Sequence, residues 1–306
     1  MMSDEKICID GGGFVQLLDV MGSDHTIASS ARVCTGKDEV DDVRDEKLIR
    51  YLFRHRHTSP FEMAEMRFLI RCPIYVMRQW VRHRTASINE VSLRYTESDC
   101  EFESIAEDLW YRQSLENRQG GGAFFPAEDG CRFQQMEAAA YEESIQAYRA
   151  LLDEGVSREL ARRVLPVSVF TTFVWKIDLH NLLHFLDLRL DPSAQLAIRE
   201  YAKAIKAHVM YYFPQTYCAF EDYQLEAVTL SSLEQQCLFE LLKYHGRIDM
   251  AGVMKYWRND VGILVGDARC RERDEFAAKL RKMKLLEEPD GGEGSQEGED
   301  RTKVEE

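Results

Sequence analysis

The stretch RHRTASINEVSLRY, from Arg82 to Tyr95, is a dense polar segment with three arginines in fourteen positions. An ordinary charge run is usually a solvated helix end. This run, however, mixes guanidinium donors with an acid, Glu90, an amide, Asn89, and a hydroxyl, Ser92. Surface ion pairs do not need such variety, whereas a phosphate joined to a heterocycle offers partners to all of these groups. We therefore expect the segment to bind a ligand of that kind.

The residues around this segment predict alternating strands and helices. Pro73 suits a first helical turn, and apolar residues recur after it at helical spacing, at Ile74, Met77, Trp80 and Val81. By the same patterns we expect strands over 14–22, 64–71 and 167–177, and helices over 27–33, around 48–53 and over 132–153, 158–165, 179–186 and 193–212.

Other local signals refine this outline. Ser157 and Asp178 each stand where a side chain can cap the helix that follows. Residues 100–130 lack a clear period and are expected to form an irregular insertion. The chain therefore divides into a folded region over 1–227, a helix-rich extension over 228–286 and an acidic tail over 287–306, which has too few apolar residues to fold.

Composition limits the class of protein. The chain has 306 residues and 45% hydrophobic content, enough for one large core with at most a small appended module. It contains no apolar run of roughly 18 residues and no basic-then-hydrophobic leader at its start, so we expect a cytoplasmic protein without a membrane partner. Its eight cysteines form no C-x-x-C pair and are expected to be free thiols, mostly small core residues.

The net charge of −14 is unevenly distributed. Residues 287–306 carry nine acids and two bases and so account for half of the excess. Sequence-independent nucleic-acid binding needs a broad basic surface, which this composition does not supply. An anionic ligand must therefore meet a local basic pocket.

A pair of histidines, His180 and His184, is spaced like the metal ligands of zinc peptidases. Asn181 stands where those enzymes carry their general-base glutamate, and an amide cannot abstract a proton from metal-bound water. We predict no metal ligands, and a metal-dependent hydrolase remains a less favoured alternative.

Three more polar residues have functional and structural interpretations. Ser92 is not part of a G-x-S-x-G motif, so it is expected to bind substrate by a hydrogen bond rather than act as a nucleophile. Arg162 and Arg189 could be surface residues. Both, however, flank apolar segments, where their side chains would be partly buried, and a buried guanidinium requires an anionic partner.

The chain resembles the flavin-dependent thymidylate synthases, whose signature is RHR followed by seven residues and serine, as in Arg82 to Ser92. The similarity covers about residues 14–225. It includes the blocks DVMG at 19–22, ARV at 31–33, HTSPFE at 57–62, RQW at 78–80, RELAR at 158–162 and LDLR at 186–189.

This resemblance implies the fold, the reaction and the assembly. The fold would be α+β, with a mixed or antiparallel sheet packed with long helices, and residues 1–227 would be the catalytic domain. The reaction would be reductive methylation of deoxyuridylate (dUMP) to thymidylate (dTMP). Methylenetetrahydrofolate would donate the carbon and NADPH-reduced FAD would carry the hydride, without a cysteine nucleophile. Relatives are homotetramers with active sites between subunits.

The resemblance also implies the site residues. Those for the flavin are His57, Ser59, Arg82, His83, Arg84, Glu90 and His184. Those for dUMP are Gln79, Arg82, Glu90, Ser92, Arg94, Arg162 and Arg189, of which Arg189 would stabilise charge developing on the uracil ring. The chain departs from the family pattern at Cys34, Met63, Leu93, Asp178 and His180. A nucleotide-binding regulatory protein without turnover remains the alternative to an enzyme.

Overall fold

The computed structural model describes residues 6–33, 36, 42–114, 121–245, 249–251, 253 and 271–286. Within it the chain forms two compact units, residues 1–225 and 226–306. The first unit ends at Leu225. The acidic tail lies outside the described residues, as does Cys34.

The first unit is α+β, as expected. Its strands are β1 (Lys6–Ile9), β2 (Gly13–Met21), β3 (Glu65–Pro73), β4 (Ser87–Glu90), β5 (Tyr111–Gln113), β6 (Gly121–Phe124) and β7 (Phe170–Asp178). Its α-helices are α1 (Asp24–Arg32), α2 (Asp42–Arg54), α3 (Ile74–Trp80), α4 (Ala127–Asp153), α5 (Arg158–Ala161), α6 (Leu179–Leu190), α7 (Leu196–Tyr212) and α8 (Pro214–Phe220). Shorter helical turns are η2 (Ser59–Met63), η3 (Glu107–Leu109), η4 (Arg162–Val164) and η5 (Glu221–Leu225).

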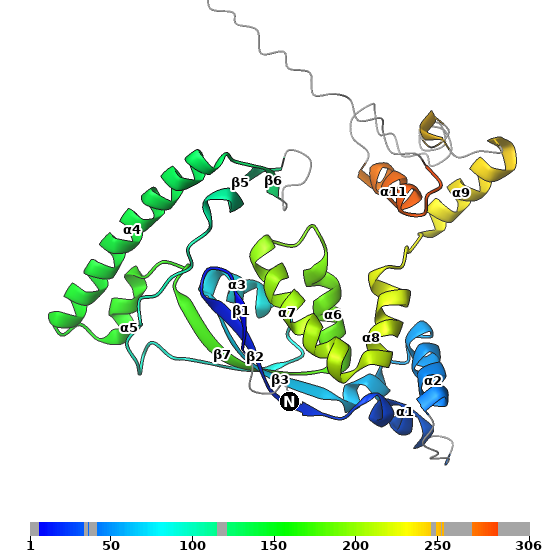
Figure 1. Cartoon of the computed structure of the whole chain (residues 1–306), viewed down its shortest axis with the longest axis horizontal. Coiled ribbons are helices and arrows are strands. Elements are labelled where there is room, and N and C mark those ends of the chain that lie inside the picture. The colour runs from blue at the N-terminus through cyan, green and yellow to red at the C-terminus, as the bar shows by residue number, and fades with distance from the viewer. Residues whose placement is uncertain are drawn as a thin grey trace, which may run out of the picture. The chain divides into compact units, whose positions relative to one another are not determined.

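Five strands form one antiparallel sheet in the order β1-β2-β3-β7-β4 (Figure 1). The β3–β7 pairing is in register along nine residue pairs, from Glu65 opposite Asp178 to Pro73 opposite Phe170. Strand β4 pairs with β7 at the sheet edge and ends with Glu90 opposite Phe173. The sequence did not predict β4, because its four residues are mostly polar and partly exposed. The sheet thus carries the polar segment into direct contact with the longest apolar strands.

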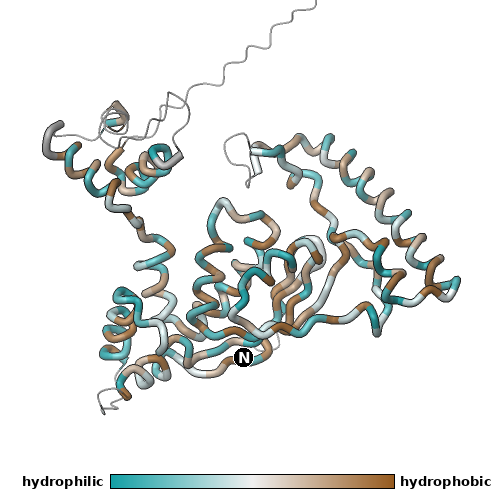
Figure 2. The backbone as a smooth tube through the Cα atoms, turned by 180° about the vertical axis from the view of Figure 1, so that it is seen from behind, coloured by the Kyte–Doolittle hydropathy of each residue, from teal (hydrophilic) through white to brown (hydrophobic). Residues whose placement is uncertain are grey.

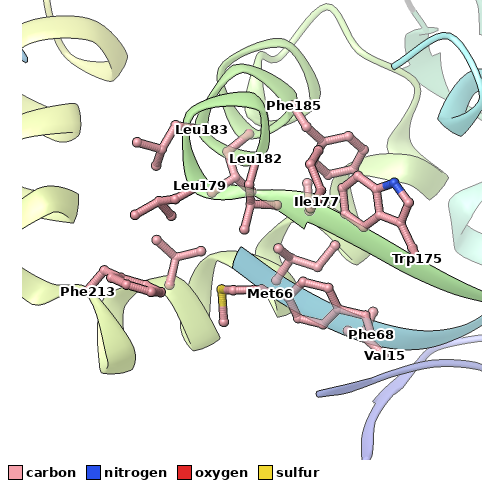
Figure 3. Packing of buried hydrophobic residues seen from close by; sticks show 14 of the residues in the cluster. Val15, Met66, Phe68, Trp175, Ile177, Leu179, Leu182, Leu183, Phe185 and Phe213 are labelled. Carbon is pink, nitrogen blue, oxygen red and sulfur yellow. The ribbon is translucent and has the colours of Figure 1, made fainter. Parts of the chain in front are cut away.

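Every second side chain of the central strands points to the same face of the sheet, and these side chains form the core. Met66, Phe68 and Ile70 of β3 are fully buried, and Trp175 and Ile177 of β7 are buried on the same side. Helices α6 and α7 pack over this face, and Figure 3 shows α6 placing its apolar side chains against the strand residues. Figure 2 shows hydrophobic residues gathering along the central strands. This continuous core fixes where α6 begins and ends, and therefore where Arg189 lies.

The opposite face of the sheet is more polar. Lys176 of β7 bonds Glu65 of the neighbouring β3 at 2.8 Å, between the amine nitrogen and a carboxylate oxygen. Arg71 of β3 donates to the carbonyl of Gly12 at 2.7 Å and to Glu101 at 2.5 Å. Cross-strand ion pairs of this kind suit a face that α6 and α7 do not cover.

Several local expectations need correction. Val81 does not continue the buried stripe of α3 and is 40% exposed, because the helix ends at Trp80. Ser157 precedes α5 but makes no side-chain capping bond, whereas Asp178 caps α6 by accepting from the backbone N–H of Asn181 at 2.9 Å. Of the six described cysteines only Cys72 and Cys237 are buried, so the thiols are not mostly core residues.

The insertion is more ordered than expected. Tyr111 in β5 pairs with Phe124 in β6, which makes a short two-stranded hairpin. Helix α4 begins at Ala127 rather than near residue 132, after Pro126. Gly130 packs so close to the backbone of Glu107 that an added Cβ would lie 1.8 Å from its carbonyl oxygen, so a larger residue there would force the insertion away from the helix.

The second unit contains α9 (Ser232–His245) and α11 (Arg271–Lys282). Phe276 and Leu280 of α11 pack with Cys237 and Leu241 of α9. Burial opposes ionisation of Glu234, but hydrogen bonds from Lys279 and Ser231 outweigh it and lower the pKa of this carboxyl. The unit therefore has its own small core with one buried ion pair. No helix in the described part of the chain is long and apolar enough to cross a membrane.

Candidate functional site

A cavity of roughly 260 Å³ lies where one face of α6 meets the segment after α3. We call it the arginine cavity. It is lined by Arg82, His83, Arg84, Thr85, Ile177, Asn181, His184, Leu188 and Arg189. No carboxylate is among these residues, so the cavity presents three guanidinium groups without a local counter-charge. Such a lining favours an anion.

Helix α6 supplies one wall of this cavity through its periodicity. Asn181, His184 and Leu188 are three, four and seven residues apart and so share one face. The opposite face carries Leu182, Leu186 and their apolar neighbours into the core. Core packing therefore sets the orientation of the cavity wall.

Arg189 is the most constrained of the three arginines. Its Nε donates to Nε2 of His83 at 3.0 Å, and its Nη2 lies 3.5 Å from the backbone carbonyl oxygen of Gln79. Burial lowers the pKa of the Arg189 guanidinium. With two of its nitrogens directed at protein acceptors, the third, Nη1, is left for a ligand.

His83 is held neutral by its surroundings. Burial, then the positive charges of Arg189 and His184, lower its pKa from 6.5 to about 4. The bond from Arg189 requires a lone pair on Nε2, which places the proton of the neutral ring on Nδ1. His184 lies on α6 with its ring centroid 6.0 Å from that of His83. The pair thus contributes polarity to the cavity without a fixed charge on His83.

Arg82 and Arg84 are at the rim, and both side chains are exposed. Within the described part of the chain neither side chain makes an ion pair or hydrogen bond. Both guanidinium groups can therefore donate to an anionic ligand.

Other predicted residues form a second group, which we call the loop cluster: Ser92, Arg94 and Arg162. None of the three lines the arginine cavity. Arg94 lies 3.3 Å from Glu159 of α5, and Arg158 of the same helix lies 3.0 Å from Glu97. These crossed ion pairs tie the loop after β4 to the turn that carries Arg162.

Glu90 is the last residue of β4 and lies in the sequence between Arg84 of the arginine cavity and Ser92 of the loop cluster. Its Oε1 accepts a hydrogen bond from the buried hydroxyl of Thr171 at 2.7 Å. Gln79 donates from its side-chain amide to Oε1 of Gln195, just before α7. Thr171 and Gln195 were not predicted as site residues, because each acts through a partner more than eighty residues away in the chain.

His57 and Ser59 lie near η2, away from the arginine cavity. His57 is exposed, and Ser59 follows two residues later. The ring of His57 contacts the ring of Tyr51 edge-on, with the ring centroids 6.0 Å apart. η2 packs against α6, so this turn shares a helix with the cavity. Among the departures, Met63 is 48% exposed and Asp178 is occupied in capping α6.

The cavity residues that the sequence did not predict are Thr85, Ile177, Asn181 and Leu188. Helical spacing from His184 could have found Asn181 and Leu188, while Ile177 enters only through the end of β7. Asn181 donates its side-chain amide to Asp178 at 2.8 Å. Within the described residues no group of three or more His, Cys, Asp or Glu side chains could hold a metal ion.

The chain is similar to known proteins along most of its length. Residues 16–215 match the family described as thymidylate synthase complementing protein. A flavin-dependent thymidylate synthase of Thermus thermophilus is 47% identical over 231 residues, 75% of this chain and 83% of that protein. The enzyme of the same name from Anaplasma marginale is 46% identical over 219 residues, 72% of this chain and 75% of that protein.

A solved structure shares the fold. It is a UMP/dUMP methylase, PolB from Streptomyces cacaoi, bound with 5-Br dUMP. The two structures align with a TM-score of 0.65 at 33% sequence identity, covering 72% of this chain and 99% of the other.

Proposed function

Because the chain belongs to the family of flavin-dependent thymidylate synthases, we propose that the arginine cavity and the loop cluster together form its flavin and nucleotide sites. The chain is an enzyme that methylates dUMP to dTMP with FAD as cofactor. The observation that supports this assignment of residues is the acid-free cavity in which Arg189 is fixed by His83. NADPH as reductant and methylenetetrahydrofolate as carbon donor complete the proposal.

The residues at the cavity fit a flavin dinucleotide. Arg82 and Arg84 are unpaired donors at its rim, which suits a pyrophosphate, and His83 and His184 add polar groups beside them. We assign His57, Ser59 and Glu90 to the same cofactor. When bound, FAD supplies the hydride that the methyl group requires.

The nucleotide would be held by Gln79, Arg82, Glu90, Ser92, Arg94, Arg162 and Arg189. Arg189 keeps its proton through the reaction because a guanidinium is not deprotonated in proteins. Its orientation is set in advance by His83 and the Gln79 carbonyl, so no reorganisation is needed when negative charge develops on the uracil ring. The hydrogen bond from Thr171 orients Glu90, and the hydrogen bond to Gln195 orients Gln79.

No cysteine nucleophile is proposed. Cys72 lies near the end of β3, shortly before the polar segment, but it is fully buried. Burial, then the negative charges of Glu90 and Glu103, raise the pKa of Cys72 well above its ordinary value. A thiol that stays protonated and inaccessible cannot attack a pyrimidine. None of the described cysteines lines the arginine cavity.

We propose a homotetramer with sites between subunits. The arginine cavity holds roughly 260 Å³, below the range of about 300–1,000 Å³ that encloses a drug-sized ligand, and FAD is larger still. The loop cluster does not line that cavity. A second copy that brings its own Ser92, Arg94 and Arg162 to the cavity would complete the site.

The decisive experiment is a reconstitution assay. Purified protein is given dUMP, methylenetetrahydrofolate and NADPH, with and without added FAD, and dTMP is measured. We expect dTMP only when all components are present. Flavin-loaded protein that binds dUMP but forms no dTMP would instead support a regulatory protein without turnover.

A further inference from the structure

A second cavity, of roughly 400 Å³, lies between the β5–β6 hairpin and the turn from α6 to α7. We call it the hairpin cavity. Its walls include Tyr111 and Phe124 of the hairpin, Ser193 and Gln195 of the turn, and Arg199 in the first turn of α7. None of these residues lines the arginine cavity. The proposed flavin and nucleotide sites therefore leave this space unused.

Arg199 is the cation of this cavity, and no acid among the described residues compensates its charge. The side chain is partly buried, its Nε is inaccessible to water, and that nitrogen has no hydrogen-bond partner. Within the described residues Arg199 is in no ion pair. One turn later on α7, Lys203 pairs with Glu200 at 2.7 Å. A partly buried guanidinium without a partner acid is costly, and an anionic ligand would offset that cost.

The surroundings select the sign of the ligand. Among the described residues, no carboxylate lines the hairpin cavity. A third cavity, also of roughly 400 Å³, shares three lining residues with it but is lined by the carboxylates Asp10, Glu103 and Glu200. An anion would avoid that neighbour and favour the side of Arg199.

The walls also select the shape of the ligand. The rings of Tyr111 and Phe124 stand nearly perpendicular, at 88°, with centroids 6.1 Å apart. Gly121 and Gly122 also line the cavity, and the Tyr111 ring packs so close to Gly121 that a Cβ there would lie 2.4 Å from it. A flat ring can contact such aromatic side chains favourably. The cavity thus suits an aromatic group that carries an anion.

Gln195 connects the hairpin cavity to the substrate residues. It lines the cavity and accepts a hydrogen bond from the side chain of Gln79. The backbone carbonyl of Gln79 in turn faces Arg189. A ligand in the hairpin cavity would therefore lie one side chain away from a residue assigned to dUMP.

We propose that the hairpin cavity is a subsite for a carboxylate on an aromatic arm, with Arg199 as its anchor. The occupant is the aminobenzoylglutamate arm of methylenetetrahydrofolate, an assignment that rests on the proposed function. One guanidinium matches one carboxylate in a two-pronged contact.

The test compares two ligands on two proteins. Tetrahydrofolate and the primary amide of tetrahydropteroate, which lacks the glutamate and carries no carboxylate, are titrated calorimetrically into the FAD-loaded, dUMP-bound enzyme and into its Arg199→Gln variant. We expect the wild type to bind tetrahydrofolate about tenfold more tightly than the amide, and the variant to bind both equally. Equal preference for the glutamate in both proteins would overturn the proposal.

Steady-state kinetics provide a second measurement. Arg199→Gln should raise the KM for methylenetetrahydrofolate about tenfold and leave kcat and the KM values for dUMP and NADPH within about twofold. A rise in the KM for NADPH alone would place a nucleotide in the cavity and contradict the folate assignment. Lys203→Gln removes a charge from the exposed side of the same helix and serves as the matched control, with no change expected.

Two further outcomes keep the proposal testable. If Arg199→Gln does not fold, Arg199→Lys is titrated instead, and a smaller preference for tetrahydrofolate than in the wild type is expected. Dissociation of the assembly in size-exclusion chromatography would show that Arg199 pairs with an acid of another copy, which would overturn the proposal. If the wild type forms no dTMP, the proposed function fails; if it forms dTMP but Arg199→Gln keeps the wild-type preference, only this inference fails.

Discussion

The arginine cavity and the loop cluster contain the same type of residue in opposite electrostatic surroundings. Arg189 makes no ion pair among the described residues and donates to a neutral histidine and a carbonyl. Arg94 pairs with Glu159, and both side chains are about half exposed. A guanidinium that is fixed and uncompensated suits the reacting ring, whereas one neutralised by a surface carboxylate can exchange that partner for a phosphate at little cost. The comparison suggests that the cavity performs the chemistry and the loop cluster binds the nucleotide.

The largest effect is expected at Arg189. Arg189→Lys keeps the charge but cannot donate to His83, Gln79 and substrate together, so kcat should fall at least about a hundredfold. Turnover and dUMP binding are measured on the flavin-loaded variant. Arg163→Lys, at an exposed arginine that lines no described cavity, is the control and should keep full activity. Near-normal kcat in Arg189→Lys would remove this residue from the chemistry.

Mixing variants tests whether the two groups meet across subunits. Arg189→Ala and the double variant Arg94→Ala, Arg162→Ala should each be nearly inactive at low dUMP. If each site takes Arg189 from one chain and the loop cluster from another, co-expression should restore up to about a quarter of the sites. Arg189→Ala mixed with His83→Ala should restore none, because both residues belong to one cavity. Equal recovery in the two mixtures would contradict this division.

A smaller effect concerns the stability of the flavin-free protein in acid. The pKa of His83 is about 4 when folded, against an ordinary value of 6.5. Between these values the unfolded chain binds more protons, so the free energy of unfolding should decrease as pH falls from 6.5 to 4. His83→Asn should lose less stability between pH 7 and pH 5 in urea titrations. His57→Asn removes an exposed ring and should lose as much as the wild type; an equal loss in His83→Asn would show that His83 is not held neutral.

The smallest effect is expected at Cys72. Cys72→Ala should keep flavin-dependent dTMP formation within about tenfold, a barrier change of about 1.4 kcal/mol. Its thiol is buried with a raised pKa, so the substitution costs only packing. Cys218→Ala, at an exposed thiol, is the control. Loss of several orders of magnitude in folded, flavin-loaded Cys72→Ala would mean that the thiol takes part in catalysis.

Sequence patterns predicted the main elements of the fold because burial imposes a period. The strands β2, β3 and β7 and the helices α1 and α7 were expected within about three residues of their observed ends, whereas α2 and α4 begin earlier than expected. The edge strand β4 and the hairpin were missed, since short polar strands bury too little to show a period. Ser157 was assigned a cap because its residue type suits one, but the position of its side chain depends on the chain around it.

The sequence alone was enough to indicate the family, the α+β class and the residues of the signature, because these depend on residue type and spacing along the chain. Only the tertiary structure showed that Arg189 donates to His83, that Thr171 holds Glu90, and that Arg199 has no counter-charge among the described residues. The bond between Thr171 and Glu90 joins residues 81 positions apart in the chain, and the bond between Arg189 and His83 joins residues 106 positions apart. Such contacts arise when strands pair and helices pack, and no local pattern records them.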